Sequence, residues 1–388
     1  MMRAPVALVI AAVALASWPL APRAGATDVR PRPLVQGVAF PTNMAFLPDG
    51  TLLFTEKETG SVRVVTPDGL VLDRPFITLP VIGDLERGLL GIAVHPAFAA
   101  EPWVYLYRSD PSDGRNTLVR VRADGLEATG EPEMLFRGLL ATAGYHNGGD
   151  LAFAGDGRLF VSIGEAHEPE RAQDANDIGG TILRLEADGS VPADNPFGAT
   201  NPVWSIGHRN SFGLCVDPAS GDLWETENGP DRDDEVNLIE EGRNYGWPVV
   251  TGVANDERFV DPVAVFPEPV AVTGCMVLEG AVWFGSFDGR VWRLPTSGDP
   301  VEVARLPAGV TDVALGPDGL VYVSSADAIS TIDPAAVGAP APAGDDGATA
   351  AGSGERGGQG WVAVAAGIVL AGALVARFLA GRRARPPR

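Results

Sequence analysis

The sequence has almost no lysine and little histidine or cysteine. Lys57 is the only lysine among 388 residues, and the formal net charge is −21. Phosphate binding needs a basic surface, so this charge argues against nucleic acid as a partner. The chain also contains no zinc-type Cys/His spacing, no Gly-x-Ser-x-Gly motif and no glycine-rich phosphate loop followed by a helix. Several common catalytic motifs are therefore excluded.

The first 26 residues have the features of a secretory signal peptide. Arg3 is the only charge before an apolar stretch, residues 6–16, and Ala24-Gly25-Ala26 offers a small-x-small cleavage site. We predict a signal peptide over residues 1–26. A permanent N-terminal membrane anchor fits less well, because the apolar stretch is short.

The other end of the chain carries a longer apolar segment. Residues 361–380 are long enough to cross a bilayer as a helix, with Arg377 close to the end. The tail, residues 381–388, holds four arginines, so the positive-inside rule predicts a cytoplasmic tail. Residues 334–360 are rich in Ala, Pro, Gly and Ser, which predicts a flexible stalk. The expected protein is an exported domain, residues 27–333, held on the extracytoplasmic face of the cell membrane by a single transmembrane helix.

The two cysteines leave two alternatives open. Cys215 and Cys275 each lie in an apolar segment typical of a strand. In an exported chain they could form one disulfide, but two buried free thiols fit the sequence equally well.

Residues 27–333 repeat one pattern six times: an apolar strand, a turn of the Pro-Asp-Gly type, and an alternating strand. The copies are residues 45–56, 92–108, 151–165, 214–227, 278–294 and 313–325. Asp-Gly and Ser-Gly turns between such segments are hairpin signals. A spacing of about 51 residues matches a four-stranded blade plus its loops, so we predict an all-β fold, a six-bladed β-propeller. A two-sheet sandwich would not explain six units.

Residues 227–237 read ENGPDRDDEVN and contain five carboxylates within nine positions. Such a run could bind a cation, act as an acid/base centre or form a solvated turn. Its spacing does not match the EF-hand pattern.

Histidines offer two further candidates. His146 opens the segment HNGGDLAF, and an imidazole on a glycine-flanked loop before an inner strand could act as a base at the channel mouth. A purely structural role is the alternative. His208, Arg209 and Asn210 are consecutive and could either bind a ligand carboxylate or clasp two blades together.

Five motifs resemble the family of PQQ-dependent soluble glucose and aldose sugar dehydrogenases, also called the glucose/sorbosone dehydrogenase family. They are ERGLLGIAVHPAF (86–98), HNGGDLAFAGDGRLFVSIGE (146–165), AQDANDIGGTILRLEADGSVPADNPF (172–197), SIGHRNSFGLCVDP (205–218) and ENGPDRDDEVNLIEEGRNYGWP (227–248). They occur in the family's order between about Phe40 and Asp333. The resemblance implies the same six-bladed propeller.

The resemblance also implies a catalytic pair. His146 matches the family's general base, which takes the proton of the sugar C1 hydroxyl while a hydride passes to the quinone. Glu165 stands where the family has an aspartate that orients this histidine.

The cofactor and metal residues are carried over in the same way. Arg209 and Asn210 match the pair that hydrogen-bonds the quinone oxygens and a carboxylate of PQQ. Gly229 and Pro230 match the positions whose backbone carbonyls bind calcium. Calcium prefers oxygen ligands, which suits this set.

Four positions depart from the family pattern. Glu86 replaces a glutamine near the base and cofactor, and Asp288 replaces a lysine that pairs with a cofactor carboxylate. Gly309 and Thr311 replace two arginines that clamp the cofactor. Charge-assisted contacts are each worth roughly 1.5–3 kcal/mol, so these changes predict weakened PQQ binding.

Three functions remain open at the level of sequence. The first is a membrane-tethered, PQQ- and calcium-dependent dehydrogenase that oxidises an aldose and passes electrons to a respiratory-chain acceptor. The second is a non-catalytic propeller that binds a sugar or a protein. The third, by fold analogy alone, is a calcium-dependent lactonase-like hydrolase.

Overall fold

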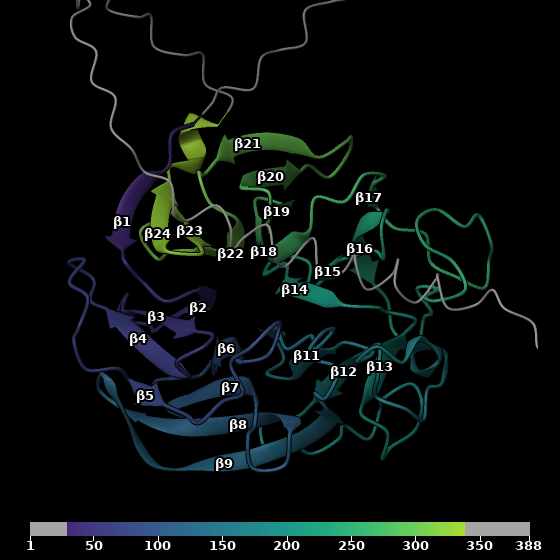
Figure 1. Ribbon diagram of the computed structural model, residues 1–388, viewed down its shortest axis with the longest axis horizontal. Helices are drawn as coiled ribbons and strands as arrows, with labels where there is room; N and C mark the ends of the chain where they lie inside the picture. The colour runs from purple at the N-terminus through teal and green to yellow at the C-terminus, as the bar shows by residue number, and fades with distance from the viewer. Residues whose placement is uncertain (1–28, 338–388) are drawn as a thin grey trace, which may run out of the picture.

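Strands account for nearly all the regular structure of this chain. The computed structural model describes residues 29–337, and within them lie 24 β-strands and two short 3₁₀ helices, η1 (Pro169–Gln173) and η2 (Pro334–Ala336). The strands form six four-stranded antiparallel sheets, arranged around an axis as the blades of a propeller (Figure 1). The predicted six-bladed β-propeller is confirmed.

The first five blades each use four consecutive strands, of which the first lies nearest the axis (Figure 1). Blade 1 comprises β2 (Pro41–Phe46), β3 (Leu52–Glu56), β4 (Ser61–Val65) and β5 (Ile77–Thr78). Blade 2 comprises β6 (Leu89–Val94), β7 (Trp103–Ser109), β8 (Arg115–Asp124) and β9 (Glu127–Leu140). Blade 3 comprises β10 (Leu151–Phe153), β11 (Leu159–Ile163), β12 (Thr181–Leu185) and β13 (Val203–Ile206). Blade 4 comprises β14 (Ser211–Val216), β15 (Leu223–Glu227), β16 (Asp234–Ile239) and β17 (Ala264–Phe266). Blade 5 comprises β18 (Val272–Leu278), β19 (Ala281–Ser286), β20 (Arg290–Leu294) and β21 (Val301–Arg305).

Blade 6 closes the ring with strands from both ends of the domain. Its inner strands are β22 (Val310–Leu315), β23 (Val321–Ser325) and β24 (Ala328–Ile332), and its outer strand is β1 (Arg32–Gln36). Because β1 pairs with β24, the two ends of the propeller domain are held together in this blade.

The sequence repeats match the first hairpin of five blades, but the fifth copy is out of phase. Residues 278–294 span β19 and β20, whereas the first hairpin of that blade is β18–β19. The prediction was wrong there because β18 is buried along nearly its whole length and lacks the alternation of a half-exposed strand. The Asp288-Gly289 turn, which the pattern predicts as the first turn of the blade, is the second turn and joins β19 to β20.

Apolar side chains fill the space between neighbouring sheets. Between blades 1 and 2, for example, Leu53 and Val64 share a buried cluster with Leu89 and Leu106. Complete burial of such a side chain stabilises the fold by about 1.5–3 kcal/mol. Within the described residues, six such clusters fill the six spaces between neighbouring blades.

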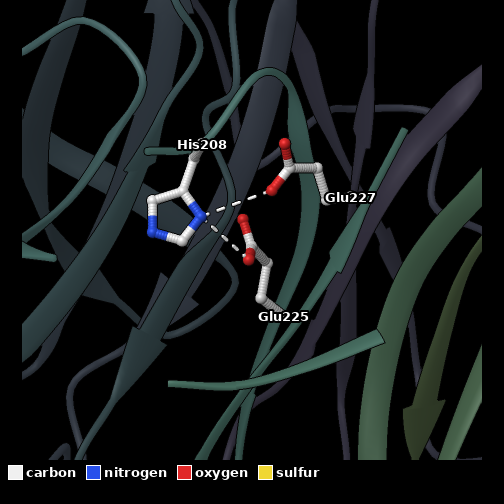
Figure 2. A group of neighbouring side chains, drawn as sticks. All are labelled: His208, Glu225 and Glu227. Atoms are coloured by element: carbon white, nitrogen blue, oxygen red, sulfur yellow. Dashed lines mark hydrogen bonds and ion pairs between the residues drawn. The ribbon is translucent and has the colours of Figure 1, made fainter. Parts of the chain in front are cut away.

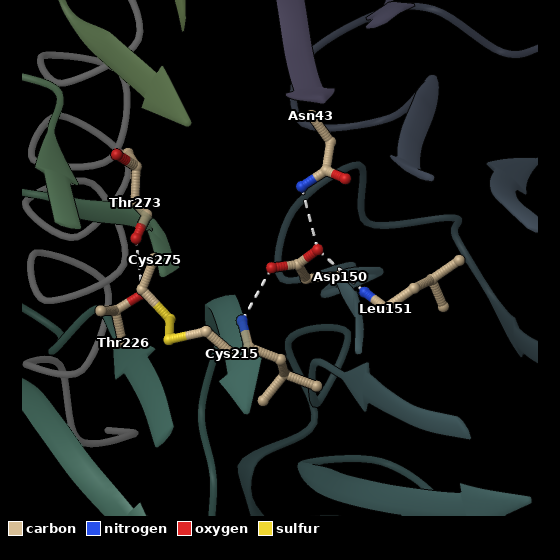
Figure 3. The surroundings of a disulfide bond; sticks show 8 residues. Asn43, Asp150, Leu151, Cys215, Thr226, Thr273 and Cys275 are labelled. Atoms are coloured by element: carbon tan, nitrogen blue, oxygen red, sulfur yellow. Dashed lines mark hydrogen bonds between the residues drawn. A yellow bond between two sulfur atoms is a disulfide. The ribbon is translucent and has the colours of Figure 1, made fainter. Parts of the chain in front are cut away.

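Polar and covalent links join the inner strands across blades. Cys215 of β14 and Cys275 of β18 form a disulfide, which decides between the two alternatives left open above. Figure 3 shows this bond and, near it, the carboxylate of Asp150 bonded to the Asn43 amide. The Asn43 Nδ2–Asp150 Oδ1 distance is 3.0 Å, and Asp150 also accepts the backbone N–H of Leu214 at 2.7 Å. Blades 1, 3, 4 and 5 are thus linked near the axis.

Removal of the disulfide is expected to destabilise the propeller. The bond closes a loop with a sequence separation of 60, so its loss increases the entropy of the unfolded chain. The double variant Cys215→Ala/Cys275→Ala should lose about 2–4 kcal/mol of unfolding free energy, measured by urea denaturation. A reducing agent should lower the midpoint of the wild type and leave that of the variant unchanged. Equal midpoints for both proteins without reductant would contradict the prediction.

Residues 29–337 include no helix that is both long enough and apolar enough to cross a membrane. The predicted signal peptide (1–26), the predicted transmembrane helix (361–380) and the tail (381–388) lie outside the described residues, as does the predicted stalk (334–360) beyond Val337.

The topology brings two kinds of connection to one end of the channel. In an antiparallel blade, the turn between the second and third strands lies at the same end as the link from the fourth strand to the next blade. Every candidate residue except Thr311 lies in or beside one of these connections, and Thr311 lies at the start of β22. The predicted site residues therefore share one mouth of the propeller.

Candidate active site

His146 and Glu165 form a buried hydrogen-bonded pair at this mouth. His146 lies in the link before β10, and Glu165 follows β11. The His146 Nδ1–Glu165 Oε1 distance is 2.6 Å, and the two residues are 8% and 1% exposed. Gly164 permits this close approach, because a Cβ there would collide with the backbone carbonyl of His146. A carboxylate on Nδ1 fixes the ring orientation and leaves Nε2 for proton exchange.

Glu86 holds the backbone around this pair. Its Oε2 accepts the backbone N–H of His146 at 2.7 Å and the Nδ2–H of Asn210 at 3.2 Å. The only lysine also holds the loop that contains Glu86. Its Nζ donates to the backbone carbonyls of Gly83, Leu85 and Arg87. Glu86 therefore connects two loops of the site.

Arg209 connects blade 3 to blade 4. Its Nη1 donates to the carbonyl of Asn228 at 2.9 Å, and its guanidinium lies 5.4 Å from the ring centroid of Trp247. Its backbone carbonyl accepts the N–H of Glu165 at 3.0 Å. Burial lowers the pKa of the guanidinium, while the carboxylates of Glu165, Glu227 and Glu86 oppose that shift.

Two acids of the segment 227–237 hold a loop in place by accepting backbone N–H groups. Asp234 accepts the backbone N–H groups of Gly229 at 2.9 Å and of Val270 and Ala271 at 2.7 Å. Glu235 accepts the N–H of Gly252 at 2.6 Å. Burial raises the pKa of both carboxyls, that of Glu235 to about 8 with a further contribution from Glu227. These two acids hold the Gly229 loop against its neighbours.

His208, which precedes Arg209 in the chain, forms a buried cluster with Glu225 and Glu227 (Figure 2). His208 Nδ1 lies 3.0 Å from Glu225 Oε2 and 3.3 Å from Glu227 Oε2, and Ser205 Oγ bonds to its Nε2 at 2.9 Å. Burial alone would lower the pKa of His208, but the two carboxylates outweigh it and raise the pKa to about 10. Glu227 Oε1 in turn accepts the backbone N–H of Arg209 at 2.5 Å. Of the two alternatives predicted for His208, the structure shows the link between blades, from Ser205 in blade 3 to Glu225 in blade 4.

Some polar atoms of the mouth have no partner within residues 29–337. They include the buried atoms Glu165 Oε2, Asn210 Oδ1 and Trp247 Nε1. Burying such atoms without a hydrogen bond costs about 1–3 kcal/mol each, so their grouping is typical of a site that receives a ligand.

His167 is a mouth residue that was not predicted from the sequence. The ring of His167 lies 4.3 Å from that of His146, centroid to centroid. Only its nearness in sequence to Glu165 could have pointed to it.

Comparison with known proteins identifies the family to which this chain belongs. Residues 38–332 match the family model described as glucose/sorbosone dehydrogenase. The chain belongs to the glucose/sorbosone dehydrogenase family. The resemblance noted from the motifs is therefore confirmed.

Among its relatives, aldose sugar dehydrogenase YliI of Escherichia coli is 32% identical over 73% of this chain and 86% of its own length. Quinoprotein glucose dehydrogenase B of Acinetobacter calcoaceticus is 30% identical over 63% of this chain and 59% of its own length. The PQQ-bound aldose sugar dehydrogenase from Streptomyces coelicolor is similar in structure, with a TM-score of 0.72 and 33% identity over 80% of this chain and 99% of that one.

The residues of this family member fit only part of PQQ. Arg209 and Asn210 offer donors where the resemblance predicts the quinone end. On the side of blades 5 and 6, Asp288 is ion-paired with Arg290, and Thr311 Oγ1 bonds to Ser324 Oγ at 2.7 Å.

Gly309 leaves no room for the arginine that the family pattern has there. A Cβ at Gly309 would lie 2.5 Å from the carbonyl oxygen of Phe287. The three positions at which the family pattern has cationic clamp residues, 288, 309 and 311, therefore carry no positive charge in this chain.

Proposed function

We propose that this protein is a sugar dehydrogenase that oxidises the C1 hydroxyl of an aldose, with His146 as the general base. The buried His146–Glu165 pair carries this proposal, because it holds an imidazole ready to take a hydroxyl proton. Membership of the glucose/sorbosone dehydrogenase family supports a sugar as substrate.

The surrounding residues support the same role. Glu165 holds the ring of His146 and stabilises the imidazolium that forms when the proton is taken. Glu86 fixes the backbone at His146 and the amide of Asn210. Arg209 supplies positive charge beside the pair, next to three carboxylates.

PQQ and calcium belong to this proposal as ligands of the mouth. PQQ, when bound, supplies a two-electron acceptor. Arg209 and Asn210 would hold its quinone end, and the carbonyls of Gly229 and Pro230 would bind calcium. Gly229 is half-buried beside Arg209, in a small cavity that Glu227 and Trp247 also line, whereas Pro230 is exposed.

Reconstitution tests the function directly. The purified protein is incubated with PQQ and calcium, and reduction of an electron-accepting dye is followed with a panel of aldoses. Turnover that depends on PQQ, calcium and sugar supports the proposal. Absence of turnover with every aldose of the panel contradicts it.

The variant Asp288→Lys is expected to tighten PQQ binding. The substitution removes one carboxylate, adds one cation and releases Arg290 from its ion pair. One charge-assisted contact of this kind corresponds to an increase in affinity of about tenfold or more. Fluorescence titration of the apoprotein with PQQ measures the dissociation constant.

Asp299→Lys is the matched control for this substitution. It makes the same charge change in blade 5, but in the exposed turn between β20 and β21 at the far end of the blade. Equal PQQ affinities for Asp288→Lys, Asp299→Lys and the wild type would show that position 288 does not face the cofactor.

The lack of positive charge at positions 288, 309 and 311 also favours a second candidate function. A propeller that binds a sugar or a protein without PQQ would keep the unpartnered polar atoms of the mouth and need no cations in blades 5 and 6. Sugar binding by calorimetry without any PQQ-dependent turnover would support this second function.

We also propose export and membrane attachment, with electrons passed to a respiratory-chain acceptor. The apolar segments 6–16 and 361–380 and the basic tail support this location. Deletion of residues 361–388 should move the protein from the membrane fraction to the soluble extracytoplasmic fraction. Unchanged fractionation would contradict the attachment.

A further inference from the structure

A second histidine lies directly against the proposed base. The rings of His146 and His167 have centroids 4.3 Å apart and an interplanar angle of 34°. On its other side, His167 contacts Tyr145, with centroids 5.5 Å apart. His146 is buried, whereas His167 is exposed, so His167 is the member of this ring pair that reaches solvent.

The backbone is arranged to place this ring. Ala166 and His167 have φ values of +55° and +63°, and His146 itself has φ +55°. Residues other than glycine rarely adopt this left-handed region, and such conformations persist where the surrounding structure holds them. Here the N–H of Ala166 donates to the carbonyl of His146 at 3.2 Å, and the N–H of Glu168 donates to that of Glu165 at 3.0 Å. The turn after Glu165 thus folds His167 back over His146.

The ring nitrogens of His167 have no hydrogen-bond partner in the described part of the chain. Partial burial of the His167 ring lowers its pKa, His146 and Arg209 lower it further, and the carboxylates of Glu165 and Glu86 oppose these effects. A neutral imidazole offers one donor and one acceptor. A sugar hydroxyl likewise donates one hydrogen bond and accepts others, so the two groups are complementary.

We propose that His167 is a substrate-binding and specificity-determining residue, whose ring packs against the base and whose nitrogens bind a hydroxyl next to the one that is oxidised. This inference rests on the proposed function, since it places the sugar at His146. A substrate that lacks the neighbouring hydroxyl loses this contact, so His167 selects polyhydroxylated substrates over simple alcohols and deoxy sugars.

Two substitutions separate packing from hydrogen bonding. His167→Phe keeps an aromatic ring against His146 without polar nitrogens. His167→Asn loses the ring but keeps a donor and an acceptor, and asparagine tolerates positive φ. His95→Phe is the matched control, because His95 also packs against aromatic rings (Tyr105 and Phe153) but lies in the turn after β6, at the opposite end of the propeller.

The test measures sugar affinity by calorimetry, and KM and kcat where turnover is found. We expect His167→Phe to weaken aldose binding and raise KM about three- to tenfold, with kcat changed less, while His95→Phe matches the wild type. The corresponding 2-deoxy sugar should bind the wild type and His167→Phe equally. An aldose dissociation constant unchanged in His167→Phe overturns the inference, whatever the result for His167→Asn, as does a wild type that binds no aldose. Binding that depends on His167 without any dye reduction overturns the proposed function and leaves this inference standing.

Discussion

Replacing His146 by alanine is expected to lower kcat for aldose oxidation by about 10²–10⁴-fold, with a smaller change in KM. General-base catalysis by a positioned side chain contributes a factor of this size. The imidazole acts on the proton that leaves in the transition state, so its loss affects the chemical step more than the binding of the ground state. Steady-state dye reduction with the reconstituted protein measures both constants.

Variants at Glu165 test the same pair from its other side. Glu165→Gln keeps a hydrogen-bonding group 2.6 Å from His146 Nδ1 but removes the charge that stabilises the imidazolium, so kcat should fall and its pH profile should shift. Glu165→Asp restores the carboxylate on a shorter side chain and should recover part of the loss. His95→Ala, which alters a histidine far from the mouth, is the control. A His146→Ala variant with full activity would remove the proposed base.

The sequence predicted the propeller and its mouth because both depend on local signals. Hairpin turns recur in each blade, and the motif residues lie in connections that an antiparallel topology brings to one end. The phase of blade 5 differs from the prediction because β18 is buried along nearly its whole length and shows no alternation.

Long-range contacts could not be predicted in the same way. The disulfide depends on the packing of blade 4 against blade 5, which places the two Cα atoms 5.7 Å apart. The contact of His167 with His146 depends on a turn with positive φ, for which the residues Ala-His give no sequence signal. Neither residue type nor spacing shows that Glu225 faces His208, since the strand register decides it.

The His208 cluster leads to the largest expected effect on stability. The imidazolium of His208 compensates Glu225 and Glu227, and all three residues are buried. His208→Ala leaves two carboxylates without their cation, and breaking a buried ion pair in this way costs about 3–5 kcal/mol. Urea denaturation at pH 7 should show this loss. The double variant His208→Ala/Glu225→Gln should recover much of it, because one uncompensated charge is removed. A single variant as stable as the wild type would mean that His208 carries no charge in the folded protein.

The pH dependence of unfolding separates this charge from a packing effect. The pKa of His208 is about 10 in the folded protein, against an ordinary value of 6.5. Between these values the folded state holds a proton that the unfolded state has released, so this contribution is complete below pH 6.5 and is lost as the pH rises through about 10. The slope is about 1.4 kcal/mol per pH unit. Glu235, with a pKa raised to about 8, also lowers the free energy of unfolding as the pH rises, but its contribution changes only between pH 4.5 and 8. Between pH 8 and 10, therefore, the stability of the wild type should fall more steeply than that of His208→Ala. Parallel curves for the two proteins over that interval would show that packing, and not the charge on His208, makes this cluster stabilising.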